Sequence, residues 1–329
     1  MQGNPNIVTY PVLQIKPYGL MVYDRVENHG PAFRHIEHSE STLVPEKPAY
    51  AGLMTPGARK RLKRAIQLIV ATALPKTAMN FKLNKEFRFK LNFITLTLPC
   101  KQGTHTDKEI KAKVLDVWIK AAKRRFKLGS YIWRAERQKN GNLHFHLVTD
   151  CYIPYDQLRD TWNDRLNALG YIDEFEKKHG HRHPNSTDVH AIKKVRNLAA
   201  YFSKYMAKGE RTAEELYRVP WARQIWHEKL LVAPGVKYKR VATREESRID
   251  GKLWDCSVNL KQKQNCEMLL EGQQLEVFSR ANEDPEVRQV STDHCLILFF
   301  SPQQFRHYIR GPMLAQYKAW LASIRGQAE

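Results

Sequence analysis

The chain has 329 residues, 42% of them hydrophobic, and its 54 Lys and Arg against 34 Asp and Glu give a net charge of +20. This length is enough to bury a large core, as one sizeable domain with additions or as two modest domains, and it excludes a miniprotein that depends on cross-links. No run of 18 apolar residues and no signal-peptide pattern occurs, so we expect a soluble cytoplasmic protein with no membrane partner.

The cysteine content argues for free thiols. The five cysteines are odd in number, widely spaced and never arranged as C-x-x-C. A disulfide framework or a zinc ribbon needs paired spacings, so both are disfavoured and a reducing compartment is indicated.

The positive charge is concentrated in one quarter of the chain, because residues 59–139 hold 22 basic and 5 acidic residues. Such a concentration suits a polyanion, since each phosphate that a cation neutralises releases counterions and adds salt-dependent affinity. A basic surface that only keeps the protein soluble is the alternative. The distribution favours nucleic acid.

The first part of the chain predicts an arm, a helix and a strand. Residues 1–50 are rich in Pro, Gly, His and isolated charges and predict an irregular N-terminal arm. Residues 56–72 predict a basic helix, because apolar residues recur every three or four positions. Residues 87–99 alternate apolar and polar side chains and predict a strand that ends at Pro99.

The middle of the chain predicts alternating helices and strands. In order, these are a helix over 106–128 capped by Thr106 or Asp107, a hairpin of strands 131–138 and 143–150, a helix over 154–170, a strand over 187–195 and a helix over 196–209. This order favours an α+β domain, with a central antiparallel sheet and flanking helices, over a doubly wound parallel sheet. We expect this domain to span residues 51–211.

Residues 212–329 differ in composition and predict a smaller, mixed accessory region. Its expected elements are a β segment over 251–260, a polar helix over 262–272, a strand over 293–300 and a closing helix over 313–326.

A candidate metal site lies in the second strand of the predicted hairpin. His144 and His146 are two residues apart, so on a strand both point to one face while Phe145 points to the other. Two imidazoles placed in this way can hold one cation. Two polar residues in a half-buried strand are the ordinary alternative, and the nearby tract His179, His181 and His183 predicts only a polar loop.

Glu136 on the preceding strand is the candidate third ligand, and the loop length decides whether it reaches the histidines. A two-residue turn at Asn140-Gly141 would place Glu136 opposite Phe145, on the wrong face. A three-residue loop or a bulge would place it opposite His144 or His146, and we therefore predict an odd loop. Two imidazoles and one carboxylate leave open positions on a divalent ion, and Mg²⁺ or Mn²⁺ is favoured over structural zinc because no ligand-spaced cysteine pair is nearby.

A second candidate group lies in the predicted helix 196–209. Tyr201 and Tyr205 are four residues apart and share a helix face, with Lys204 alongside. Paired tyrosines usually pack in a core, but lysines among them are less ordinary. A tyrosine with a pKa near 10 is a weak nucleophile, so a cation beside the scissile phosphate would supply much of the activation.

The strand FITLTLP, then HFH, then YFSKY, in that order, resemble the three motifs of the HUH endonuclease superfamily. Within it, the chain is similar to rolling-circle replication initiators of single-stranded DNA phages and small plasmids, the two-tyrosine class that includes microvirus A proteins. The resemblance covers roughly residues 55–210. Conjugative relaxases have the tyrosine before the histidine motif, so the order disfavours them.

The resemblance implies a nickase that acts on single-stranded DNA at a replication origin in a bacterial cytoplasm. It implies Glu136, His144 and His146 as metal ligands and the two tyrosines as nucleophiles, one forming a 5′-phosphotyrosyl link and the other acting in the joining step. A site with a single essential tyrosine, helped by Lys204, fits the same letters. No P-loop motif occurs, so a host helicase and a host DNA polymerase are the expected partners.

Two other functions fit parts of the same sequence. A basic origin-binding protein without chemistry would use the histidines in its core and stack the tyrosines on bases. A two-tyrosine transposase would use the same chemistry on a different DNA.

Overall fold

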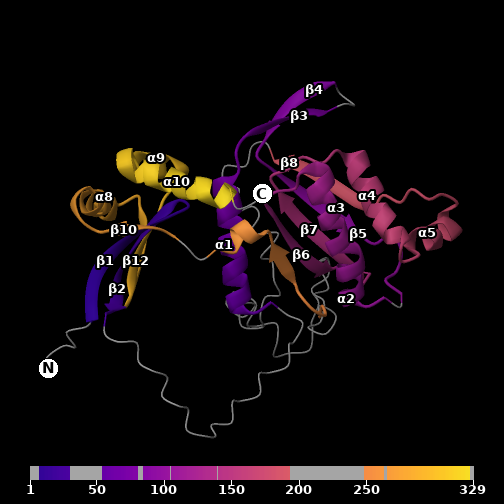
Figure 1. The fold of residues 1–329 in the computed structure, drawn as a ribbon, viewed down its shortest axis with the longest axis horizontal. Helices are drawn as coiled ribbons and strands as arrows, with labels where there is room; N and C mark the ends of the chain where they lie inside the picture. Colours follow the sequence, from indigo (N-terminus) through magenta and orange to yellow (C-terminus); the bar gives the residue numbers. More distant parts are fainter. Residues whose placement is uncertain are drawn as a thin grey trace, which may run out of the picture. The chain divides into compact units, whose positions relative to one another are not determined.

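The computed structural model describes residues 7–29, 54–80, 84–103, 105–138, 140–192, 248–262 and 265–326. Contacts between Cα atoms divide the chain into two compact units, a larger one over Pro48–Lys261 and a smaller one that joins Met1–Lys47 to Gln262–Gln327. Each unit contains its own five-stranded sheet, labelled in Figure 1.

The larger unit contains the candidate site in its sheet. The sheet has the order β8-β5-β7-β6-β9, and every neighbouring pair is antiparallel. Its strands are β5 (Leu91–Thr97), β6 (Tyr131–Arg137), β7 (Leu143–Thr149), β8 (Thr187–Ile192) and β9 (Trp254–Cys256). With helices on the sheet, this confirms the predicted α+β class with a central antiparallel sheet.

One face of this sheet is the main core. The helical elements packed there are α2 (Asp107–Glu109), the π-helical turn η1 (Ile110–Leu115), α3 (Asp116–Phe126), α4 (Tyr155–Asn167) and α5 (Tyr171–His179). Trp118 of α3 and Trp162 of α4 meet edge to face with their ring centroids 6.1 Å apart, and Phe145 of β7 lies 6.2 Å from Trp162. All three side chains are fully buried, so Phe145 turns the core side of β7 inward and leaves His144 and His146 on the other side.

The opposite face of the sheet, which carries the histidines, is partly covered by helix α1 (Pro56–Thr72). The Oγ1 atom of Thr55 caps this helix by accepting a hydrogen bond from the amide of Ala58 at 3.2 Å. α1 contacts β6 and the short 3₁₀ turn η2 (Val258–Leu260), and none of its residues belongs to the core beneath α3 and α4. The bounds of α1 match the predicted basic helix.

Two further predictions in the larger unit need correction. The predicted strand over 87–99 is interrupted at Lys90, because β4 (Lys85–Phe89) pairs with β3 (Lys76–Asn80) in a separate two-stranded ribbon before β5 begins. The predicted helix over 106–128 is present, and a capping box of Thr106 and Glu109 starts it. α5 was not predicted, and His179 is its last residue, while His181 and His183 lie in the loop after it.

The smaller unit packs helices against a sheet of order β10-β1-β2-β12-β11. Its elements are β1 (Ile7–Lys16), β2 (Gly19–Asn28), β10 (Cys266–Leu269), α8 (Gly272–Glu283), β11 (Arg288–Thr292), β12 (Cys295–Phe299), α9 (Pro302–Tyr308) and α10 (Gly311–Gly326). Leu13, Leu20 and Leu298 from the sheet pack with Phe305 and Tyr317 from the helices. The predicted strand over 293–300 and closing helix over 313–326 are confirmed.

Two predictions in this unit are wrong. Residues 7–28 form two ten-residue strands and not an irregular arm. Val12 and Gln14 are buried as well as Leu13 and Ile15, so the alternation that marks a half-exposed strand is missing. The predicted polar helix over 262–272 is replaced by β10, which pairs with β1, and a helix begins only at Gly272. Pairing with a distant strand outweighs local helix propensity there.

Some expectations fall on residues that the structure does not describe. The predicted helix over 196–209 and the predicted domain boundary between residues 211 and 212 lie outside the described residues. Within the described ranges, no helix has the length and apolar composition needed to cross a membrane.

Candidate metal centre

The loop between β6 and β7 brings Glu136 to the histidine face. Glu136 pairs with His144 across the ladder, and Arg134 pairs with His146. Gln138 donates its amide to the carbonyl of Asn142 at 2.8 Å, so residues 139–141 form a three-residue loop. Gly141 closes the loop with φ +83° and donates to the carbonyl of Gln138 at 2.9 Å. The predicted odd loop is confirmed.

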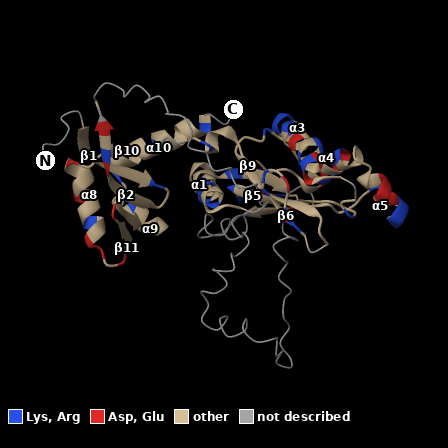
Figure 2. Cartoon of the chain, turned by 90° about the horizontal axis from the view of Figure 1, so that it is seen from below, with Lys and Arg blue, Asp and Glu red and all other residues tan. Residues whose placement is uncertain are grey.

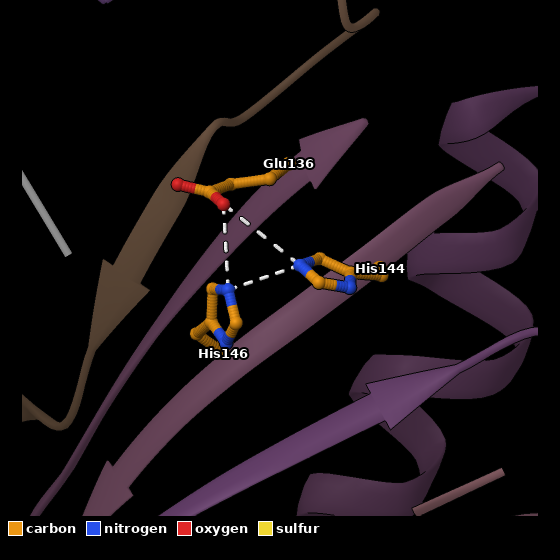
Figure 3. A group of neighbouring side chains, drawn as sticks. All are labelled: Glu136, His144 and His146. Atoms are coloured by element: carbon orange, nitrogen blue, oxygen red, sulfur yellow. Dashed lines mark hydrogen bonds and ion pairs between the residues drawn. The ribbon is translucent and has the colours of Figure 1, made fainter. Parts of the chain in front are cut away.

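The three candidate ligands converge, as Figure 3 shows. The Nε2 atoms of His144 and His146 are 2.9 Å apart, and the Oε2 atom of Glu136 lies 3.3 Å from the Nε2 of His146 and 3.8 Å from that of His144. Each side chain is mostly buried. The group is therefore three donor atoms from two adjacent strands that point at one space.

The spacing of these atoms fits a divalent cation. A circle through three points separated by 2.9, 3.3 and 3.8 Å has a radius of about 2.0 Å, which matches ligand distances of about 2.0–2.2 Å for small divalent ions. One ion can therefore contact all three donors at once. Two nitrogen donors and one carboxylate oxygen suit Mn²⁺ and related ions, and three protein ligands leave positions for a substrate.

Charge at the site is set by Glu136 and its neighbours. Burial raises the pKa of Glu136, but the two imidazoles and the Arg134 guanidinium outweigh this and lower it to about 2. The Nη1 atom of Arg134 lies 3.3 Å from the Oε1 atom of Glu136, which leaves Oε2 directed at the histidines. Glu136 therefore stays a carboxylate at neutral pH, as a metal ligand must.

Residues on β5 support the histidines from behind. The Oγ1 atom of Thr95 lies 3.4 Å from the Nδ1 atom of His146, and the ring of Phe93 lies 5.1 Å from the His146 ring. The Nδ1 atom of His144 is buried and has no hydrogen-bond partner among the described residues. A hydrogen bond to the distal nitrogen orients an imidazole ligand, so His146 is the better oriented of the two.

A polar cluster holds the loop end of the hairpin. Arg137, next to Glu136, donates to the carboxylate of Asp107 at 2.6 Å and to the side-chain oxygen of Gln102 at 3.1 Å. Gln102 also accepts from the amide of Leu143 at 3.0 Å. These bonds join α2, the segment after β5 and both hairpin strands, so they help to fix the register that aligns Glu136 with His144.

The sequence interpretation missed Arg134, Thr95 and Phe93 as neighbours of the site. Strand alternation held the signal, because Arg134 is two residues before Glu136, and Phe93 and Thr95 share one parity on β5. The pairing of β5 with β7 was the missing information.

The triad opens to solvent in a hollow lined by Glu136, Arg137, Gln138, Asn140, His144 and His146. A ligand in this hollow would meet the three donors directly. The predicted nucleophiles Tyr201 and Tyr205, and Lys204 between them, lie outside the described residues.

Comparison with known families gives one match: residues 91–210 match a family of replication-associated proteins described by the name ORF2. The matched segment begins with β5, contains the β6–β7 hairpin and β8, and extends past the two tyrosines. It supports a replication-associated role and a rolling-circle Rep-type protein. Comparisons with curated proteins and with solved structures found no match.

Proposed function

We propose that this protein starts rolling-circle DNA replication by cutting, and later rejoining, one DNA strand at an origin, as a metal-dependent nickase of the two-tyrosine HUH type. One observation carries the proposal: Glu136, His144 and His146 converge at the mouth of an open hollow. The segment that holds them matches a replication-associated family. The strong basic charge of residues 59–139 suits a DNA substrate.

The proposed reaction is a transesterification. The phenolic oxygen of Tyr201 or Tyr205 attacks the phosphorus, the bond from phosphorus to O3′ breaks, and the phenolic proton ends on the released 3′-hydroxyl. The 5′-phosphate stays on the tyrosine, so the phosphodiester energy is kept and a polymerase can extend the free 3′-end. In the joining step a 3′-hydroxyl attacks a phosphotyrosyl link and restores the phenol. Lys204 would hold the phosphate or favour the phenolate.

The triad would hold Mg²⁺ or Mn²⁺, which when bound would neutralise the scissile phosphate and polarise its P–O bond. Arg134 contributes by holding one oxygen of Glu136, so that the other stays directed at the histidines. Phe145 contributes from the core, since its burial fixes the strand face on which His144 and His146 lie.

The test uses single-stranded oligonucleotides that tile the DNA carrying this gene, incubated with the protein and Mn²⁺. A 3′-labelled strand should become covalently attached to the protein, whereas a 5′-labelled strand should yield only a shorter free product. The adduct should disappear with EDTA and in the Tyr201→Phe/Tyr205→Phe variant. Absence of an adduct from the wild-type protein, or an adduct that survives in the double variant, would overturn the proposal.

The same assay separates the other functions. Salt-dependent DNA binding without an adduct would support a non-catalytic origin-binding protein. An adduct confined to transposon-end sequences would support a transposase. The host helicase and polymerase remain proposed partners, and the bacterial cytoplasm remains the proposed location.

A further inference from the structure

Helix α1 carries a row of cations without any acidic residue. Its first nine residues include Arg59, Lys60, Arg61, Lys63 and Arg64, and its 17 residues contain no Asp or Glu. Lys60, Arg61 and Lys63 are exposed and form no ion pair with any described residue. They project from the side opposite to the buried Leu62 and Ile66.

This arrangement opposes the stability of the helix. Cations in the first turns face the positive end of the helix dipole, which disfavours them. Like charges three and four residues apart repel one another, and Lys60, Lys63 and Arg64 have this spacing. A solvated helix surface usually mixes both signs and avoids both costs. Local violations of this kind are expected at functional sites, and here they point to an anionic ligand.

The excess charge is local to this part of the molecule. Residues 54–80 hold six basic and no acidic residues. The described residues of the smaller unit, 7–29 and 265–326, hold eight basic and nine acidic residues. Figure 2 shows the blue side chains on α1. A general requirement for solubility would not confine the excess in this way.

α1 covers the sheet face that holds the metal centre. Ile132 and Val148 pair with each other and share the parity of Glu136 and His144, so they lie on that face. Both are fully buried, neither belongs to the core beneath α3 and α4, and α1 contacts β6. In Figure 1, α1 runs beside the β6–β9 edge of the sheet.

The Lys60, Arg61 and Lys63 side chains, which we name the α1 cation row, therefore lie on an element that borders the proposed reaction centre. We propose that the α1 cation row binds the phosphodiester backbone of the single DNA strand that enters this centre. The proposal rests on the proposed function for the identity of the strand, and on charge complementarity for the contact. Backbone contacts of this kind hold a strand in place and carry no sequence preference.

The test compares two variants with equal loss of charge. Lys60→Gln/Lys63→Gln removes two cations of the row, and Lys177→Gln/Lys178→Gln removes two exposed lysines of α5 as the matched control. Affinity is measured over a range of salt for single-stranded DNA and, in a second arm, for duplex DNA. The row variant should lower the slope of log affinity against log salt by about 1.4 for the single strand, at about 0.7 for each phosphate contact. The control variant should leave the slope unchanged.

Three readouts decide the outcome. Equal slopes for the row variant and the wild type would overturn the inference, as would a loss confined to duplex DNA. The thermal midpoint of unfolding of the row variant should be equal to or above that of the wild type, because repulsion is removed, so a lost slope cannot be assigned to unfolding. Adduct formation tests the proposed function separately: a changed slope without a wild-type adduct retains the cation row and rejects the nickase, and an adduct with an unchanged slope does the reverse.

Discussion

Glu136 faces His144 directly across the β6–β7 ladder, and the three-residue loop between the strands sets this pairing. The side chains of a strand alternate between its two faces. A loop shorter by one residue would therefore send Glu136 to the core side, among residues such as Phe145. The candidate metal centre thus depends on the length of a loop that contributes none of its three ligands.

Deleting Asn140 should abolish the site by changing the register. The shortened loop would favour a two-residue turn, and Glu136 would no longer lie on the histidine face. We expect Mn²⁺ affinity, measured by titration calorimetry, to fall to the level of a Glu136→Ala variant. Asn140→Ser keeps the loop length and should bind as the wild type does. Retention of wild-type affinity by the deletion variant would contradict the role of the register.

Gly141→Ala should destabilise the larger unit through the backbone alone. Gly141 has φ +83°, and an added Cβ atom would meet nothing within 4 Å. The left-handed conformation costs an L-residue about 1–2 kcal/mol, and asparagine tolerates it better than alanine. Chemical denaturation should therefore rank the free energy of unfolding as wild type, then Gly141→Asn, then Gly141→Ala. Equal values for the two variants would show that the loop relaxes.

Removing any one of the three candidate ligands should weaken metal binding severely. Losing an outer-sphere partner of a metal site costs about 10- to 100-fold in affinity, so loss of a direct ligand should cost at least as much. Glu136→Gln, His144→Ala and His146→Ala should each meet this threshold in Mn²⁺ titrations. Two imidazole donors should also make Mn²⁺ bind more tightly than Mg²⁺. Unchanged affinity in His144→Ala would reduce the site to a pair of ligands.

Asp107→Asn should weaken the anchor of the hairpin. Asp107 is 4% exposed and accepts from Arg137 at 2.6 Å, from Gln102 at 2.7 Å and from the amide of Asp250 at 2.9 Å. Removing one charge of a buried pair costs about 3–5 kcal/mol, and the partial exposure of Arg137 should reduce this to about 2–3 kcal/mol. Denaturation measures that loss. Asp164→Asn, an exposed change of equal charge on α4, should have little effect.

Lys111 should make the stability of the larger unit rise with pH in the alkaline range. Burial lowers the pKa of Lys111 from 10.5 to about 8, against the opposing effect of Asp107 and Asp250. Between about pH 8 and 10.5 the unfolded chain holds this proton and the folded chain has released it. The free energy of unfolding, taken relative to Lys111→Met, should therefore rise across this window, by no more than about 1.4 kcal/mol per pH unit. A flat difference would show that the ammonium stays charged in the fold.

Local patterns were sufficient for much of the larger unit. The apolar repeat of α1, the capping pair of Thr106 and Glu109, and the alternation around His144 each report contacts within one element or one hairpin. The three candidate ligands could be predicted for the same reason, since a short loop joins their strands.

Contacts between distant segments could not be predicted. Thr95 meets His146 only because β5 pairs with β7 from the other side, 51 residues away. β1 lost its visible alternation because both of its faces are covered, and β10 forms a strand because β1 provides its partner. In each case the information lies in the pairing and not in the segment.

The smaller unit has a consequence for how the protein is made. β1 and β2 leave the ribosome first, but their neighbours β10 and β12 follow about 240 residues later, on the order of 10–50 s at ordinary rates of synthesis. A two-stranded hairpin is marginally stable alone in water, so it must wait while the strands of the other sheet are completed. The N-terminal hairpin therefore spends translation with unpaired edges, and a folding defect in this protein should first appear there, as exposure of β1 and β2 to proteases or chaperones.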